Sequence, residues 1–160
     1  MMRILRERIV DPLLSLLKQG LSPRDLALCI ALGVGVGLFP VLGVSTPALT
    51  VAALALRLNL PAIQIVSYAM SPVQLALIIP FMRFGEWVLG SPPQPMSVSA
   101  GMEILTQGVL HAIVTLWDAI VHAAIGWILI GPWAIYIMFK VLQPLLTRTA
   151  QRLESSANDR

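Results

Sequence analysis

The sequence predicts an all-α integral membrane protein, and three observations carry that prediction. Hydrophobic residues make up 57% of the 160-residue chain and charged residues 12%, against about 45–50% and about 25% in soluble globular domains. The mean hydropathy is +0.81. The charged residues gather toward the two ends, and uncharged runs fill residues 26–56, 58–82 and 119–139. Each run reaches the roughly 20 residues that a helix needs to cross a bilayer core, so we expect a single membrane domain over residues 1–160.

The same composition argues against other classes of protein. A net charge of +3 suggests nucleic acid, but the basic residues flank apolar segments and do not alternate with aromatic residues. Positive-inside topology explains them better, and no nucleic-acid partner is expected. The single Cys29 has no partner for a disulfide, and we interpret it as a packing residue. The sequence contains no catalytic or metal-binding motif, so we expect no catalytic residue, no metal and no cofactor.

Residues 1–25 are predicted to carry a cytoplasmic interfacial helix. Asp11 and Pro12 start a short helix that Gly20 ends, and this helix is far too short to span a bilayer. Charged residues interrupt the apolar positions before it, which is unlike the unbroken apolar core of a signal peptide.

Residues 26–58 are predicted to form a re-entrant hairpin. A helix from Leu26 to Phe39 rises only about 21 Å, which is less than the bilayer core of about 30 Å. A polar break between Pro40 and Pro47 follows, and then a second short helix over residues 48–58. The alternative is one kinked span. Irregular backbone at membrane depth must be buried in protein or line a wet cavity, which makes the break a candidate binding site. Its candidate residues are Pro40, Gly43, Ser45 and Thr46, and Thr46 is the predicted cap of the second helix.

Residues 59–90 repeat this plan more weakly, as an interrupted helix. Asn59 and Pro61 start a helix, and Ser71 with Pro72 interrupts it. We add Asn59, Ser71 and Pro72 to the candidate binding residues, because paired interrupted segments resemble those of transporters with internal repeats. The segment crosses the membrane once, or forms a second hairpin.

The last third of the chain is predicted to hold a loop at residues 91–100, an amphipathic helix at 101–122, a transmembrane helix at 123–146 that is interrupted at Gly131 and Pro132, and a polar, frayed tail at 147–160. Polar residues of the amphipathic helix fall on one face at spacings of three and four; they are Gln107, His111, Thr115, Asp118 and His122. Either this stripe lines a cavity in which Asp118 and His122 share a proton or bind an ion, or the helix lies in the interface with the stripe in water. We favour the second interpretation. Arg83 and Glu86, three residues apart, are expected to pair with each other.

Several motifs in residues 22–90 resemble a known family. They are the pattern S-P-x-x-L-A from Ser22, the run GVGVGLFPVLG from Gly33, Asn59 after an Arg-Leu pair, and Pro72 with Gly85 beyond it. On these motifs the chain resembles the bacterial membrane family called domain of unknown function 2062. This chain departs from the family pattern at Ser45, where Gln is usual, and at Ser71, where Asn is usual. The resemblance implies a location in the bacterial inner membrane and implies no activity.

Three functional hypotheses follow from the sequence. The first is non-enzymatic translocation or handling of a lipid, an ion or a small solute by the interrupted helices, whose N-termini at Thr46 and Pro72 would face a polar group. Because 160 residues are few for a transporter, we expect a homo-oligomer. The second is an accessory or scaffold subunit that docks an envelope partner through residues 101–122. The third is a membrane enzyme using Asp118 and His122. In all three the protein is multi-pass, the lipid bilayer is a partner, and both termini are cytoplasmic.

Overall fold

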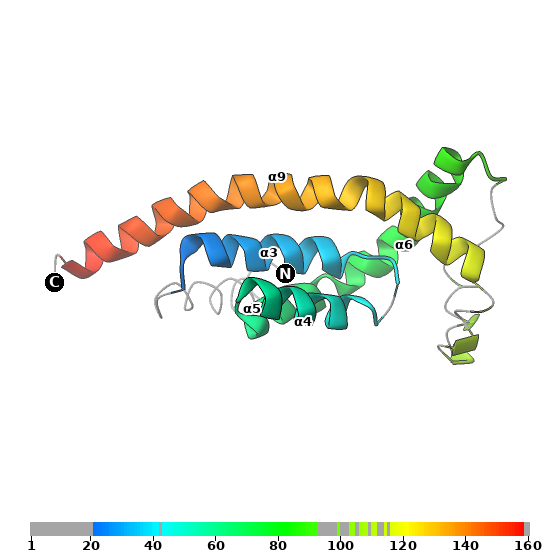
Figure 1. The fold of residues 1–160 in the computed structure, drawn as a ribbon, viewed down its shortest axis with the longest axis horizontal. Coiled ribbons are helices and arrows are strands. Elements are labelled where there is room, and N and C mark those ends of the chain that lie inside the picture. Colours follow the sequence, from blue (N-terminus) through cyan, green and yellow to red (C-terminus); the bar gives the residue numbers. More distant parts are fainter. Residues whose placement is uncertain are drawn as a thin grey trace.

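The computed structural model describes residues 21–41, 43–92 and 116–158, with a few short stretches between positions 99 and 114. The regular elements in this part of the chain are all α-helices: α3 (Pro23–Gly37), α4 (Ser45–Leu56), α5 (Leu60–Ala69), α6 (Ser71–Leu89) and α9 (Trp117–Asn158) (Figure 1). The prediction of an all-α chain is therefore confirmed. The interfacial helix expected before Gly20 lies outside the described residues.

Helices α3 and α4 fold back on each other. The Ser22 hydroxyl accepts a hydrogen bond from the Asp25 amide at 3.0 Å and so caps α3, and the chain leaves the helix after Gly37, ahead of Pro40. Helix α4 then returns alongside α3 in the opposite direction (Figure 1). The structure thus has the fold-back and not the single kinked helix.

The start of α4 differs from the prediction. It begins at Ser45 and not at residue 48, so Thr46 lies inside the first turn and does not cap the helix. Pro47 did not delay the start, because proline is tolerated in the first turn, where its missing N–H would have no intrahelical partner. Val44 occupies the cap position and makes no side-chain capping bond.

Helices α5 and α6 continue in one direction with a kink between them. The Asn59 side chain accepts a hydrogen bond from the Ala62 amide at 2.9 Å, which starts α5 as predicted. At the interruption Met70 keeps a helical conformation, and its carbonyl accepts a bond from the Gln74 amide at 2.8 Å. Residues 60–89 therefore form a bent rod (Figure 1), and the alternative of a second hairpin is wrong.

Helix α9 is a continuous rod of 42 residues. It has no boundary at residue 122, no break at Pro132 and no frayed end after residue 147. Both of its internal prolines lie within the helix. A lone proline removes one helical bond and bends the rod without ending it. The expected continuous helix over 101–122 is also wrong: Gly108 has φ +118°, and Leu116 forms a turn before α9 begins.

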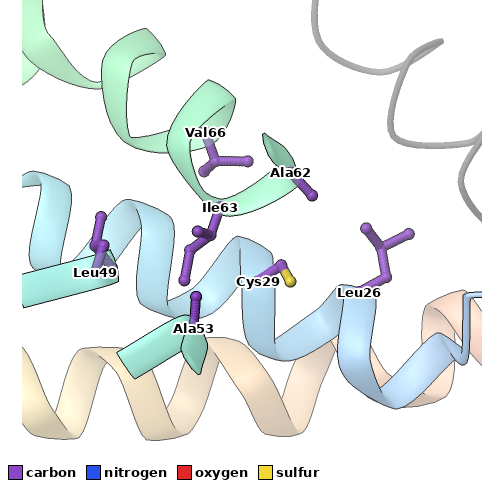
Figure 2. Packing of buried hydrophobic residues seen from close by; sticks show 7 residues of the cluster. All are labelled: Leu26, Cys29, Leu49, Ala53, Ala62, Ile63 and Val66. Carbon is purple, nitrogen blue, oxygen red and sulfur yellow. The ribbon is translucent and has the colours of Figure 1, made fainter. Parts of the chain in front are cut away.

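The core lies where α3, α4 and α5 meet. Its buried side chains are Leu26, Cys29, Leu49, Ala53, Ala62, Ile63 and Val66 (Figure 2). Cys29 is fully buried there, in agreement with its interpretation as a packing residue. A second, smaller cluster joins α6 to α9 through Met82, Ala119 and Ala123.

Two of the described helices are long and apolar enough to cross a membrane, namely α6 and residues Trp117–Gln151 of α9. Large apolar side chains project from their outer faces, including Trp87, Trp133 and Ile137, which are 76%, 69% and 60% exposed. This exposed apolar surface is typical of a membrane-associated protein.

Candidate functional site

The two interruptions of the chain contact each other. We call the described residues between α3 and α4, which are 38–41, 43 and 44, the hairpin tip. The amide Nε2 of the Gln74 side chain, one turn after the kink between α5 and α6, donates a hydrogen bond of 2.6 Å to the Phe39 carbonyl of this tip. Gln74 is 5% exposed. A buried side chain of one interrupted segment therefore holds the irregular backbone of the other.

Two more side chains bind carbonyls on either side of the tip. The indole Nε1 of Trp127 donates to the Gly35 carbonyl at 3.1 Å, and the Gln64 amide donates to the Thr46 carbonyl at 3.3 Å. The three donors come from α6, α9 and α5. The Gly35 carbonyl also accepts from the Leu38 amide, and the Thr46 carbonyl from the Thr50 hydroxyl. Since an unpaired buried carbonyl costs about 1–3 kcal/mol, the bond from Gln74 to Phe39 is the one that most favours the non-helical turn, and the other two hold its flanks.

Apolar packing closes the tip on the side of α9. The Phe39 ring meets the Trp127 ring edge to face, with centroids 5.0 Å apart and planes at 87°. Pro40 is buried. Trp127 thus supplies both a donor and a packing surface, which fixes the tip against α9.

The charges of the described helices separate to the two ends of the body. Arg24, Arg57 and Arg148 lie near one end, where the neighbouring residues Leu21, Leu58 and Leu146 pack on the same core cluster. The opposite end carries the ion pair between Arg83 and Glu86, 2.9 Å apart, which the sequence predicted.

The tip lies near the middle of the distance between these charged ends. Along α9, Trp127 is nine residues from Asp118 and thirteen from Lys140, or about 13 Å and about 20 Å at 1.5 Å per residue. Along α6, Gln74 is also nine residues from Arg83. Both helices therefore place the tip at about the same distance from the end of the body that carries Asp118 and Arg83.

One comparison with known proteins identifies the family of the chain. The family model described as "Uncharacterized protein conserved in bacteria (DUF2062)" matches residues 3–154. The chain belongs to the DUF2062 family. The match extends well beyond the motifs of residues 22–90, to include most of α9. No curated protein and no solved structure matches the chain.

The predicted binding residues of this DUF2062 protein are only partly brought together. Pro40 and Ser45 are buried at or beside the tip, and Thr46 contributes its carbonyl to Gln64. Gly43 is exposed in the tip with φ +84°. Ser71 and Pro72 are exposed in the first turn of α6.

Asn59 lies elsewhere, away from the tip. Its side chain caps α5, and its carbonyl faces the Cys29 sulfur at 3.8 Å, at the arginine-rich end of the body. Asn59 therefore has a structural task in the start of α5 and does not join the tip.

Sequence reasoning missed the three donors of the DUF2062 tip. Gln64 and Gln74 are the only glutamines between residues 20 and 93. An amide inside an apolar helix needs a partner, and that rule was the available signal. Trp127 gave no comparable signal, because interfacial anchoring explained it equally well.

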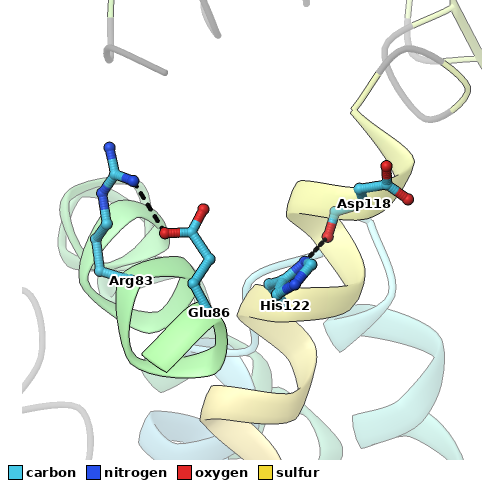
Figure 3. A network of polar contacts seen from close by, with 4 residues as sticks. All are labelled: Arg83, Glu86, Asp118 and His122. Atoms are coloured by element: carbon cyan, nitrogen blue, oxygen red, sulfur yellow. Dashed lines mark hydrogen bonds and ion pairs between the residues drawn. The ribbon is translucent and has the colours of Figure 1, made fainter. Parts of the chain in front are cut away.

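The predicted polar stripe does not form along one helix. His111 is exposed and precedes α9, and the position of Thr115 lies outside the described residues. His122 uses Nδ1 to donate to the backbone carbonyl of Asp118, at 2.5 Å, because a carbonyl can only accept. The Asp118 carboxylate points away from α6 (Figure 3). The His122 ring thus bonds to the Asp118 backbone and not to the Asp118 carboxylate.

Proposed function

We propose that this DUF2062 protein is a multi-pass protein of the bacterial inner membrane that translocates or handles a lipid, an ion or a small solute at the hairpin tip. The observation that carries the proposal is the hydrogen bond from Gln74 to the Phe39 carbonyl. It joins the two interrupted segments, and Gln74 belongs to α6, which is one of the two helices with the length and apolarity of a membrane span.

In the proposed arrangement the bent rod of α5 and α6 crosses the membrane once and α9 crosses back. The uncharged run of α9 between Asp118 and Lys140 has 21 residues and a rise of about 32 Å, which matches a bilayer core of about 30 Å. The arginine-rich end lies in the cytoplasm by the positive-inside rule. Both chain termini are then cytoplasmic, and residues 91–100 face outward.

Helices α3 and α4 form the re-entrant hairpin of this proposal. The 15 residues of α3 rise about 22 Å, so the hairpin enters from the cytoplasmic side and turns back inside the bilayer. Irregular backbone is tolerated at that depth only where protein or water satisfies it. Gln74 meets that requirement for the Phe39 carbonyl, and Gln64 and Trp127 bind carbonyls on its two flanks.

The hairpin tip suits recognition of a polar group better than a kinked span would. It presents Gly43 on an exposed turn and places Ser45 and Thr46 beside it, in the first turn of α4. Helix N-termini favour polar or anionic groups. A homo-oligomer would cover the exposed apolar faces of α4 and complete a cavity around this turn.

Two measurements test the proposal. Resistance of the protein to alkaline extraction tests membrane insertion. Reconstitution into liposomes then tests flux of a panel of ions, small solutes and labelled phospholipids. We expect flux above that of empty vesicles for at least one member, a changed rate in Gln74→Leu, and an unchanged rate in Gln151→Leu, which alters an exposed glutamine far from the tip. The absence of flux across the whole panel would refute translocation.

The second candidate function is an accessory or scaffold subunit that docks an envelope partner. The observation in its favour is the length of α9, whose C-terminal turns project beyond the start of α3 (Figure 1) and continue twelve residues past Leu146. Affinity purification in mild detergent distinguishes the two. A stoichiometric partner protein supports the scaffold, and a clean homo-oligomer counts against it.

A further inference from the structure

Four exposed basic residues surround the arginine-rich end of the body. Arg24 lies in the first turn of α3, Arg57 directly follows α4, and Lys140 and Arg148 lie on α9. We call these four residues the basic rim. Among the described residues none of the four forms an ion pair, whereas Arg83 at the other end of the body pairs with Glu86. The positive charges of the rim are therefore not neutralised by a described acidic side chain, and they can attract an external anion.

Arg57 has an unusual backbone for its residue type. Its φ and ψ of 55° and 38° are left-handed, and it is the only described non-glycine residue with positive φ. It follows the last turn of α4, where its amide binds the Leu54 carbonyl and the Leu58 amide binds the Ala53 carbonyl. This position strongly favours glycine, because a side chain strains the left-handed conformation. Folding alone would be better served by glycine, so the arginine side chain is present for something other than the turn.

The surroundings of the rim indicate the kind of anion. Exposed apolar side chains lie directly beside its cations, among them Leu56 next to Arg57 and Val141 next to Lys140. The Lys140 ammonium lies over the Tyr136 ring, 5.5 Å from its centroid. Cations that border an apolar belt occupy the depth of lipid phosphates, and clusters of this kind bind anionic headgroups. The described residues of the basic rim do not include the row of stacked aromatic rings that is typical of a site for single-stranded nucleic acid.

We propose that the basic rim binds the phosphate groups of anionic phospholipids, and that Arg57 is one of its contacts. The ligand is the membrane lipid and not free phosphate, because the apolar belt below the rim accommodates acyl chains. The inference rests on the membrane residence proposed above and does not depend on translocation.

The test measures lipid selectivity of the full-length protein. Purified protein in a non-ionic detergent receives equimolar phosphatidylglycerol and phosphatidylcholine, and native mass spectrometry counts the bound molecules of each. We expect wild type to prefer phosphatidylglycerol, and Arg57→Gln to reduce the preference about fivefold, as expected for one cation near anionic headgroups. The triple variant Arg24→Gln/Arg57→Gln/Arg148→Gln should bind the two lipids nearly equally.

Two matched variants separate charge from backbone strain. Arg57→Lys keeps the charge and the strain, and it should keep the preference. Arg57→Gly removes both, and it should lower the preference about fivefold while raising the thermal midpoint. A structural role alone would not produce this opposite movement of stability and lipid selectivity.

Several outcomes would overturn the inference. One is equal binding of the two lipids by wild type, and another is an unchanged preference in both Arg57→Gln and Arg57→Gly. Displacement of phosphatidylglycerol by millimolar inorganic phosphate would show that the rim takes free phosphate. Loss of an acidic partner protein on rim neutralisation, with lipid preference intact, would assign the rim to protein binding. Failure of membrane residence is detected separately by alkaline extraction, and absence of flux leaves the lipid result unaffected.

Discussion

Two glycines lie at two kinds of close helix contact, and the clash caused by alanine should be relieved by a second mutation at one of them but not at the other. A Cβ atom at Gly85 would lie 1.9 Å from the backbone carbonyl oxygen of His122, where α6 crosses α9. A Cβ atom at Gly35 would lie 2.0 Å from Cγ1 of Ile135, a side-chain atom. The first obstacle belongs to the backbone and cannot be trimmed by mutation, whereas the second can.

The magnitude follows from the distances. Ordinary contact begins at 3.4 Å, so α6 and α9 must separate by about 1.5 Å to admit a methyl group at position 85, and a gap of about 0.5–1 Å already forfeits a quarter to a half of each neighbouring dispersion contact. Overpacking of this kind costs about 1–3 kcal/mol, and the better helix propensity of alanine offsets about 1 kcal/mol of it. We expect Gly85→Ala to lower the free energy of unfolding by up to about 2 kcal/mol, and Gly35→Ala to lower it by a similar amount.

The assay is a pair of double-mutant cycles read by thermal exposure of Cys29, the only cysteine, which is fully buried. Ile135→Ala should rescue Gly35→Ala, with a coupling of about 1 kcal/mol or more. His122→Ala should leave Gly85→Ala unrescued, with additivity within about 0.5 kcal/mol. Equal coupling in the two cycles, or a more stable Gly85→Ala, would refute the assignment of this contact to the backbone.

Three further predictions concern the tip and the rim. Gln74→Leu leaves the Phe39 carbonyl unpaired and should lower the free energy of unfolding by about 1–3 kcal/mol; labelling of Cys29 on heating measures it, and an unchanged midpoint would contradict it. Arg57→Gly should raise the free energy of unfolding by about 1 kcal/mol in the same assay, and a fall would mean that the left-handed turn is not strained. Trp127→Phe keeps the ring contact but loses the indole donor, so it should lower the free energy of unfolding by about 1 kcal/mol. Unchanged protection of the tip amides in hydrogen exchange would show that this bond does not stabilise the tip.

The sequence predicted helix starts accurately where the signal is local. Ser22 and Asn59 each bind a backbone amide three residues ahead, so the chemistry that starts α3 and α5 is contained in a few consecutive residues. The two interruptions were found for the same reason, since proline and glycine act on the backbone at their own positions. The G-x-G-x-G run from Gly33 lies at close helix contacts, because α3 lies between α5 and α9.

Predictions failed where distant segments decide the outcome. Gly131 and Pro132 were expected to interrupt the last helix, yet α9 passes through them, and the Trp127 ring packs over Gly131. The partners of Gln64 and Gln74 lie 18 and 35 residues away in the sequence. Contacts between residues so far apart in the sequence leave no periodic pattern in it. The residues that hold the tip are therefore evident only from the packing of the helices.

Because of the way α6 crosses α9, the hydrogen bond from Gln74 to Phe39 is the most informative about function. Gly126 contacts the Phe81 carbonyl and lies one residue from Trp127, so the crossing holds Trp127 close to its pivot. Gln74 lies eleven residues from Gly85, about 16 Å along α6. A tilt of α6 about the crossing therefore moves Gln74 much further than it moves Trp127. Opening of the tip by movement of α6 must therefore break the bond from Gln74 to Phe39 before the bond from Trp127. In a translocating protein Gln74→Leu changes the rate of flux, whereas in a scaffold it changes stability alone.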